Sequence, residues 1–276
     1  RLAPVTLAGQ PRVIKDVVEI EAGAIHSCLL LTNGSVLCAG QGVLHGELGN
    51  GTFTNARLPV AVSGLSGVQT IAAGANHTCA VVADTTVRCW GRGLEGQLGN
   101  GTASTSNVPV TVTGLTGVVD LEAGTNHTCA LLADTTVRCW GANADGQLGD
   151  GTTTTATTPV AVSGLTGATD VTAGTNHSCA VRSDGTARCW GANALGQLGT
   201  GGGSSLVPAT VSGLTGAVQI TAGQSYTCAT LTGGGGRRQS PAEAMVKSAM
   251  RSLGSNVGRK VGNAIVRGVL GSIMKR

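Results

Sequence analysis

The sequence contains few aromatic and few charged residues. Phe, Tyr and Trp together make up 2% of its 276 positions, and charged residues make up 12%. A core built on aromatic rings is therefore excluded, and Val, Ala, Leu, Thr and Cys must pack in thin layers, which suits short twisted strands. No run of about 20 apolar residues occurs, so no segment is predicted to span a membrane as a helix. Neither a phosphate-binding loop nor a serine in a nucleophile elbow is present.

The net charge of +4 hides two segments of opposite charge. Residues 1–236 hold 9 Lys and Arg against 13 Asp and Glu, whereas residues 237–276 hold 9 Lys and Arg and the single acid Glu243. An acidic body with a basic tail indicates two separate segments. The sequence starts at Arg1 and shows no signal peptide, and we expect the natural N-terminus to lie upstream.

Four stretches of the chain are near-copies of one another, repeated every 50 or 51 residues. The three best copies read GANHTCAVVADTTVRCWG from Gly74, GTNHTCALLADTTVRCWG from Gly124 and GTNHSCAVRSDGTARCWG from Gly174, and a more divergent copy starts at Gly23. A period near 50 residues predicts a propeller or a solenoid. A residue that recurs in every copy is expected to serve the repeat rather than one catalytic centre.

One repeat unit contains four predicted strands. They cover Val118–Gly124, His127–Asp134, Thr135–Gly141 and Thr158–Leu165, with Pro159 at the start of the last strand, where a missing N–H is tolerated. Four strands per unit correspond to one propeller blade. The predicted fold class is therefore all-β, a β-propeller of four-stranded blades.

The strings NHTCAL, DGTARCWG, GQLGDGT and PVAVSGL resemble the repeat of the regulator-of-chromosome-condensation (RCC) family over about residues 1–232. The resemblance implies a β-propeller, usually of seven blades, that binds other proteins. Three Trp residues fall at the family's Trp-Gly position, namely Trp90, Trp140 and Trp190. The first copy departs there with Ala39, and a fifth, partial copy carries Tyr226 where the others have His.

The ends of the repeat array allow two arrangements. Residues 4–9 could supply the last strand of a blade whose first half is residues 217–232, which would close a five-bladed ring. The alternative is an open arc or distorted ring, which the larger blade number of the family favours. We expect the chain to divide into units at about 17–67, 68–116, 117–167 and 168–216, a partial unit from 217–232 and 1–16, a linker at 233–239 and a basic helical tail at 240–276.

Eight of the nine cysteines form pairs with nine residues between the partners. The pairs are Cys28/Cys38, Cys79/Cys89, Cys129/Cys139 and Cys179/Cys189, and Cys228 is left over. A three-residue loop with Gly185 in the left-handed conformation would pair Arg182 with Thr186 and place Cys179 directly opposite Cys189, near disulfide range. We therefore predict four disulfides within the blades and an extracellular, cell-surface or periplasmic location. Two alternatives remain open at this stage, buried free cysteines and a zinc site formed by His177, Cys179 and Cys189.

The repeated histidines are the obvious candidates for catalytic bases. They are His26, His77, His127 and His177. Because they recur in separate blades, they cannot converge on one substrate, and we expect them to make structural hydrogen bonds. No catalytic residue, metal ligand or cofactor is predicted, and we expect the protein not to be an enzyme. His45 lies outside the repeat pattern and has no predicted partner.

The predicted function is that of a secreted bacterial scaffold that binds a partner protein and is itself a monomer. Its paired cysteines argue against a nuclear location. Its candidate binding loops cover about Leu94–Ser106 and Ala144–Thr157, which vary between blades while the strands stay constant. The residues singled out in them are Leu94, Glu95, Asn100, Asp145 and Asp150. The RCC resemblance also implies an alternative role as a guanine-nucleotide exchange factor or regulator.

The last residues differ from the repeats. Ser240, Pro241 and Glu243 form a helix-start pattern that predicts a basic amphipathic α-helix. The strings MVKSAMRSLGSNVGR and IVRGVLGS resemble the C-terminal tail of bacterial HerA-type ATPases, without any nucleotide-binding motif. Three interpretations stay open: a helix that contacts a partner or an anionic membrane surface, a chimera without independent function, and a mobile tail. Nucleic-acid binding is not expected, because the tail has no aromatic residue to stack on bases.

Overall fold

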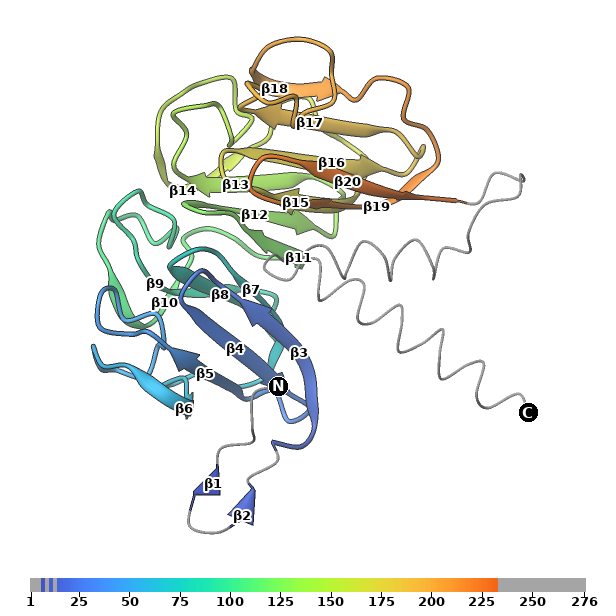
Figure 1. Cartoon of the computed structure of the whole chain (residues 1–276). Helices are drawn as coiled ribbons and strands as arrows, with labels where there is room; N and C mark the ends of the chain where they lie inside the picture. Colours follow the sequence, from blue (N-terminus) through green and yellow to red (C-terminus); the bar gives the residue numbers. More distant parts are fainter. Residues whose placement is uncertain (1–5, 8–9, 12–13, 233–276) are drawn as a thin grey trace, which may run out of the picture.

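The computed structural model describes residues 6–7, 10–11 and 14–232 (Figure 1). This part of the chain is all-β and contains twenty strands. None of its segments forms a helix that could cross a membrane. The predicted C-terminal helix and the HerA-like strings fall on residues 233–276, outside the described residues, and so do the interpretations that depend on them.

Sixteen of the strands form four antiparallel sheets of four strands each, which we call blades 1 to 4. The first strands of the blades, and of a two-stranded half-blade that follows them, are β3 (Val17–Ala22), β7 (Val68–Ala73), β11 (Val118–Ala123), β15 (Ala168–Ala173) and β19 (Ala217–Ala222). The second strands are β4 (His26–Leu31), β8 (His77–Val82), β12 (His127–Leu132), β16 (His177–Arg182) and β20 (Thr227–Leu231). The third strands are β5 (Val36–Gly40), β9 (Val87–Gly91), β13 (Val137–Gly141) and β17 (Ala187–Gly191). The outer strands are β6 (Ala56–Ala61), β10 (Ser106–Thr111), β14 (Ala156–Ala161) and β18 (Ser205–Thr210).

The outer strand of blade 3 differs from the prediction. In blade 3 it covers Ala156–Ala161 rather than Thr158–Leu165, and Pro159 lies inside it rather than at its start. The register against β13 shifts between the Cys139–Val160 pair and the Gly141–Ala156 pair, which takes Pro159 out of the ladder. A proline is tolerated there because it lies at a bulge of an edge strand, where no donor is needed.

The turn between the second and third strands sets the register of the cysteines. In blade 4, Arg182 N–H donates to the carbonyl of Thr186, and Gly185 has φ of 75°. Cys179 is therefore opposite Cys189, as predicted, and the two are bonded. The structure contains all four predicted disulfides, Cys28–Cys38, Cys79–Cys89, Cys129–Cys139 and Cys179–Cys189. The free-cysteine and zinc alternatives for these residues are therefore wrong.

The same turn forms without glycine in the middle blades. Thr85 and Thr135 occupy the Gly185 position with φ of 63° and 68°, a conformation that a β-branched residue rarely adopts. Each threonine hydroxyl accepts a hydrogen bond from the next blade, Thr85 Oγ1 from Gly117 N at 3.0 Å and Thr135 Oγ1 from Gly167 N at 3.2 Å. This bond between blades partly offsets the strain.

The blades follow one another in an arc with its concave side formed by the first strands (Figure 1). Contacts between first strands run in order from β3 to β7, β11, β15 and β19. Blade 1 and the half-blade β19–β20 form separate sheets at the two ends. The five-bladed ring closed by a composite blade is therefore wrong for the described residues. Thr6–Leu7 pairs with Gln10–Pro11 instead of with the half-blade, because a local hairpin loses far less chain entropy than pairing across the whole array.

The core lies between the blades. Each of three buried clusters combines the disulfide and aliphatic residues of one blade with the Trp of the next. Trp90, Trp140 and Trp190 are completely buried in these clusters. Burying an indole ring is one of the largest single contributions that a core residue makes, so the three tryptophans join the blades into one body.

Candidate protein-binding face

The repeated histidines join each blade to the next through a hydroxyl group. His77 Nε2 lies 2.9 Å from Thr128 Oγ1, and His127 Nε2 lies 2.8 Å from Ser178 Oγ. The Thr128 hydroxyl donates to the carbonyl oxygen of Gln97, which also accepts the indole N–H of Trp140. Because the hydroxyl proton is used on that carbonyl, the histidine must donate from Nε2 and leave Nδ1 unprotonated.

Burial keeps these histidines neutral. It lowers the pKa of His77 and of His127 from 6.5 to about 3, and that of His26 and of His177 to about 4. Nδ1, where a second proton would bind, has no hydrogen-bond partner among the described residues. Protonation would therefore place a charge in the core without compensation.

The His127–Ser178 pair has the distance of a base and a nucleophile, but its surroundings prevent that chemistry. Both side chains are fully buried, and the Ser178 hydroxyl donates to the carbonyl of Gln147 at 3.0 Å. A nucleophile needs access to a substrate and a proton directed at its base. The pair has neither and connects blades 3 and 4.

The Trp and His contacts run in opposite directions along the array. Trp140 of blade 3 reaches back to a carbonyl of blade 2, whereas His77 of blade 2 reaches forward to a hydroxyl of blade 3. Ala39 replaces the Trp in blade 1, which has no preceding blade among the described residues, and Tyr226 replaces the His in the half-blade at the other end. The two departures from the repeat thus fall at the two end surfaces.

One face of the arc carries the loops that follow the third strands. We call it the loop face and define it by residues 41–55, 92–105, 142–155 and 192–204. Backbone bonds hold these loops, for example from Gly96 N to Gly93 O and from Gly99 N to Gly96 O, both at 2.9 Å. Gly101 N also donates to Thr157 O of the next blade at 2.9 Å. The loops are therefore fixed on the blades rather than free to sample many conformations.

Two of the five residues predicted for binding are used to build the loops. Asn100 Oδ1 accepts bonds from the N–H and hydroxyl of Thr102. Asp150 Oδ1 does the same for Thr152 and also accepts from Asn143 Nδ2. Both residues therefore stabilise turns.

The other three predicted residues lie on the loop face with different exposure. Leu94 is 55% exposed. Glu95 forms an ion pair with Arg92, and Asp145 is half-buried in the equivalent place of blade 3. The structure therefore places these three on one face but does not gather them into a catalytic cluster.

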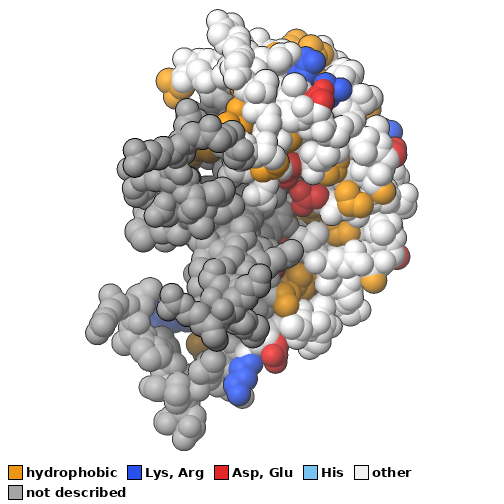
Figure 2. All heavy atoms as spheres, turned by 90° about the vertical axis from the view of Figure 1, so that its right-hand side faces the viewer, with side chains coloured by type: hydrophobic (Ala, Val, Ile, Leu, Met, Phe, Trp, Pro, Cys, Tyr) orange, Lys and Arg blue, Asp and Glu red, His pale blue; other side chains and the backbone are white. Residues whose placement is uncertain are grey.

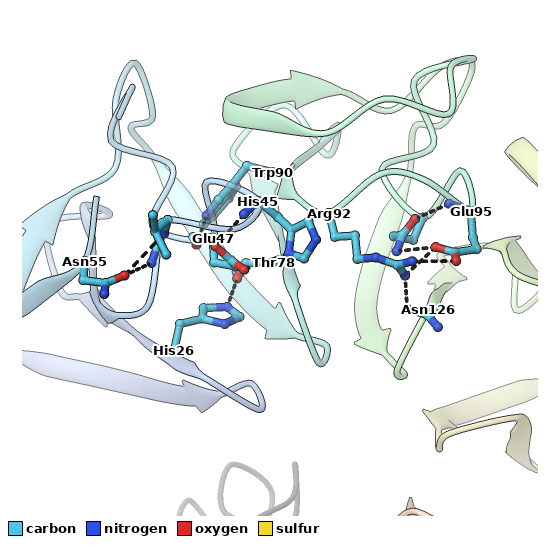
Figure 3. Close-up of polar contacts among 12 residues, drawn as sticks. His26, His45, Glu47, Asn55, Thr78, Trp90, Arg92, Glu95 and Asn126 are labelled. Atoms are coloured by element: carbon cyan, nitrogen blue, oxygen red, sulfur yellow. Dashed lines mark hydrogen bonds and ion pairs between the residues drawn. The ribbon is translucent and has the colours of Figure 1, made fainter. Parts of the chain in front are cut away.

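Two polar contacts on the loop face were missed from the sequence (Figure 3). Arg92 links two blades, because its guanidinium donates to Asn126 Oδ1 at 2.8 Å as well as to Glu95. His45 has a partner after all, since its Nδ1 lies 3.0 Å from Oε1 of the buried Glu47. A position-by-position comparison of the repeats would have indicated both, because Glu47 stands where the other copies have Gln and Arg92 where two have Ala.

A hollow of about 210 Å³ lies at the axis of the arc. Every first strand contributes its last residue and the Gly that follows, and the lining consists of Ala, Gly, two Thr and one Gln. Among the described residues, no charged side chain and no His or Cys lines it. The hollow thus offers backbone groups and small side chains, which do not support acid–base or metal chemistry.

Exposed apolar side chains stand on the loop face. They are Val43, Leu44, Phe53, Leu94 and Leu195. Charged side chains are sparse over the described surface that Figure 2 shows, and most of it is uncharged polar side chain and backbone. Apolar tips on fixed loops with few charges are typical of surfaces that bind proteins.

The comparisons with known proteins agree with this architecture. The Regulator of chromosome condensation (RCC1) repeat matches residues 33–81, 86–131, 136–181 and 184–230. The chain belongs to the RCC1-repeat family. A second form of this repeat matches residues 68–97, 118–147 and 168–197. The matches of the first form start near the third strand of one blade and end in the second strand of the next. The two central matches contain both residues that join neighbouring blades, the Trp and the His, whereas the first has Ala39 in place of the Trp and the last has Tyr226 in place of the His.

The individual relatives give limited information about function, because they are much larger than this chain or distant from it in sequence. Human E3 ubiquitin-protein ligase HERC2 is 37% identical over 78 residues, which are 28% of this chain and 2% of the ligase. The structure of human WBSCR16 superposes with a TM-score of 0.72 at 25% identity, over 81% of this chain and 60% of that one. Prp20p of Saccharomyces cerevisiae, which was studied for binding to Gsp1p and histones, gives 0.72 at 22% identity, over 87% of this chain and 61% of that one. The chain thus spans about three fifths of these two structures, and Prp20p shows the fold alone.

Proposed function

We propose that this RCC1-repeat propeller is a non-enzymatic scaffold, secreted by or displayed on a bacterium, that binds a partner protein through its loop face. The proposal rests on a contrast within the loop of blade 2, whose backbone is held by hydrogen bonds while an apolar side chain at its tip is exposed. Gly96, Gly99 and Asn100 hold the backbone with hydrogen bonds, while the neighbouring Leu94 is exposed. Fixed loops reduce the entropy lost on binding, and apolar tips supply contact area.

The proposed location rests on the cysteines. All eight repeat cysteines are bonded in pairs, and such bonds persist in oxidising compartments. An extracellular, cell-surface or periplasmic scaffold is compatible with them. A nuclear regulator or exchange factor, the alternative implied by the family, would have to keep these bonds in a reducing environment.

The experiment compares changes on the loop face with a matched change elsewhere. Wild-type protein, the double variant Leu44→Asp/Leu94→Asp and the variant Val119→Asp on first strand β11 are immobilised and incubated with extracellular and periplasmic proteins. The two leucine side chains and the valine side chain are exposed to similar degrees, between 55% and 58%, so none of the substitutions disturbs the core. Any captured protein is then purified, and its dissociation constant is measured for each variant.

We expect the purified partner to bind the double variant at least about tenfold more weakly, since each lost apolar contact in a binding surface is worth about 1 kcal/mol or more. Val119→Asp should change the constant less than about twofold. Equal weakening by both variants, or no direct binding of any purified protein, would contradict the proposal. Release of labelled guanine nucleotide from a small GTPase on adding the chain would instead support the exchange-factor alternative.

A further inference from the structure

The end of the array at β20 contains a pocket of about 350 Å³ between blade 4 and the half-blade. Its walls include Gln197, Leu198, Gly199, Val211, Leu214 and Ala229. The same positions of the preceding blades surround a tryptophan of the following blade. The fourth cluster is formed by equivalent positions but contains no tryptophan. We call this pocket the terminal socket.

Three filled sockets show what the terminal socket lacks. A Cβ added to Gly99 or Gly149 would lie 2.8 Å or 2.7 Å from the indole of the following blade, whereas one added to Gly199 would meet only Val211 Cγ1, at 3.2 Å. The carbonyls of Gln97 and Gln147 each accept an indole N–H and a hydroxyl. The carbonyl of Gln197 accepts the Thr227 hydroxyl, and the described residues supply no indole for it.

The β20 edge beside the socket is also incomplete. In every full blade the second strand pairs with a third strand, but β20 pairs with β19 alone among the described residues. Cys228 lies where Cys179 and its equivalents form disulfides, and it is an exposed free thiol. The other eight cysteines of the sequence are bonded, so none of them can pair with it.

No aromatic side chain within the 276 residues is left to fill the socket. The three tryptophans are buried in their own sockets, and the remaining aromatic residues are Phe53, in a loop of blade 1, and Tyr226, which lines the socket itself. Residues 233–276 contain no aromatic residue. An indole for the socket must therefore come from outside residues 1–276.

We propose that the β20 edge and the terminal socket accept an extended strand from another polypeptide that carries the sequence Cys-Trp-Gly. In the register of the full blades, its Trp is opposite Thr227 and its Cys is opposite Cys228. The indole enters the socket and donates its N–H to the Gln197 carbonyl. The strand adds backbone bonds to β20, which is a known mode of peptide recognition. This site is separate from the loop-face proposal and does not depend on it.

A disulfide can then form by exchange. If the partner cysteine carries a small thiol as a mixed disulfide, the Cys228 thiolate attacks the partner sulfur, a new S–S bond forms, and the small thiol leaves as its thiolate. No external oxidant is required, because the mixed disulfide supplies the oxidised sulfur.

The probe is a peptide with the sequence of residues 186–193, TARCWGAN, supplied as its mixed disulfide with glutathione. A second peptide has Ala in place of Trp. Full-length protein is mixed with each peptide, and the amount of the peptide–Cys228 adduct is followed by intact mass spectrometry. Two protein variants are matched for backbone strain: Gly199→Ala, whose Cβ would enter the socket, and Gly213→Ala, whose Cβ meets nothing within 4 Å, with φ of 64° and 67° in the wild type.

The Trp peptide is expected to label wild-type protein and Gly213→Ala at least about tenfold faster than the Ala peptide does. Gly199→Ala should remove this preference while leaving the slow reaction with the Ala peptide unchanged. Equal rates for the two peptides on wild-type protein would show simple thiol reactivity and overturn the proposal. An unchanged Trp preference in Gly199→Ala, or slow labelling of wild-type protein by both peptides, would also overturn it.

Discussion

Lowering the pH is expected to destabilise the protein through its four histidines between blades. Their folded-state pKa values of about 3 to 4 lie below the ordinary value of 6.5 because burial disfavours the charged ring. Between pH 6.5 and these values the unfolded chain binds more protons than the folded chain, so stability decreases as the pH falls. At pH 5 each histidine has lowered the free energy of unfolding by about 2 kcal/mol relative to pH 7.5, and the four together have lowered it by about 8 kcal/mol. That loss is comparable with the entire stability of a typical domain, about 5–15 kcal/mol.

The magnitude at pH 5 depends little on the folded-state pKa values, because both lie well below that pH. Equilibrium urea unfolding, followed by the fluorescence of the three buried tryptophans, measures the loss at several pH values from about 7.5 to 5. His127→Gln removes one titrating site and keeps a donor for Ser178. The decrease in unfolding free energy of this variant between pH 7.5 and 5 should therefore be smaller than that of the wild type by about 2 kcal/mol. The hydroxyl and backbone bonds of Thr86 lower the pKa of Asp84, whose stabilisation is lost only below its usual pKa of 3.8, outside this range. Unchanged stability between pH 7.5 and 5, or a wild-type slope in His127→Gln, would refute the reasoning.

Three further predictions concern the joints between blades and the disulfides within them. Gly124→Ala should destabilise the protein by about 2 kcal/mol or more in urea unfolding, because the added Cβ would lie 2.4 Å from the Gly174 carbonyl oxygen. Gly202→Ala meets nothing within 4 Å and should leave stability unchanged within about 1 kcal/mol, so equal effects would contradict the close-approach argument. Trp140→Ala should cost about 3–5 kcal/mol, measured in the same way, and a loss below about 1 kcal/mol would be inconsistent with its burial. Reduction under denaturing conditions should add the mass of eight hydrogens, two for each of the four disulfides, and an unchanged mass would show that the bonds are absent.

The features that repeat within one blade can largely be predicted from the sequence. The strand pattern and the position of Gly185 predicted that Cys179 is opposite Cys189, because loop length determines register in a hairpin. The predicted outer strand of blade 3 begins two residues and ends four residues after the observed one. The prediction puts Pro159 at the start of the strand, whereas Pro159 lies at a bulge inside β14.

Contacts between blades could not be predicted from the repeat pattern. The recurrence of His and Trp indicates a structural role but not a direction, and the structure shows His77 reaching forward and Trp140 reaching back. Asn100 and Asp150 looked like surface residues because they lie in polar loops, but their side chains are used in turns. Local turn chemistry and solvent-exposed binding groups use the same residue types, so composition cannot separate them.

Hydrogen exchange of the loop amides in the free, full-length protein tests the central claim most directly, which is that rigid blades present fixed loops for binding. Gly96, Gly99 and Gly101 donate backbone bonds of 2.9 Å, so their amides should exchange as slowly as those of strand β9. Complete exchange of these three amides within seconds, while β9 stays protected, would contradict the account.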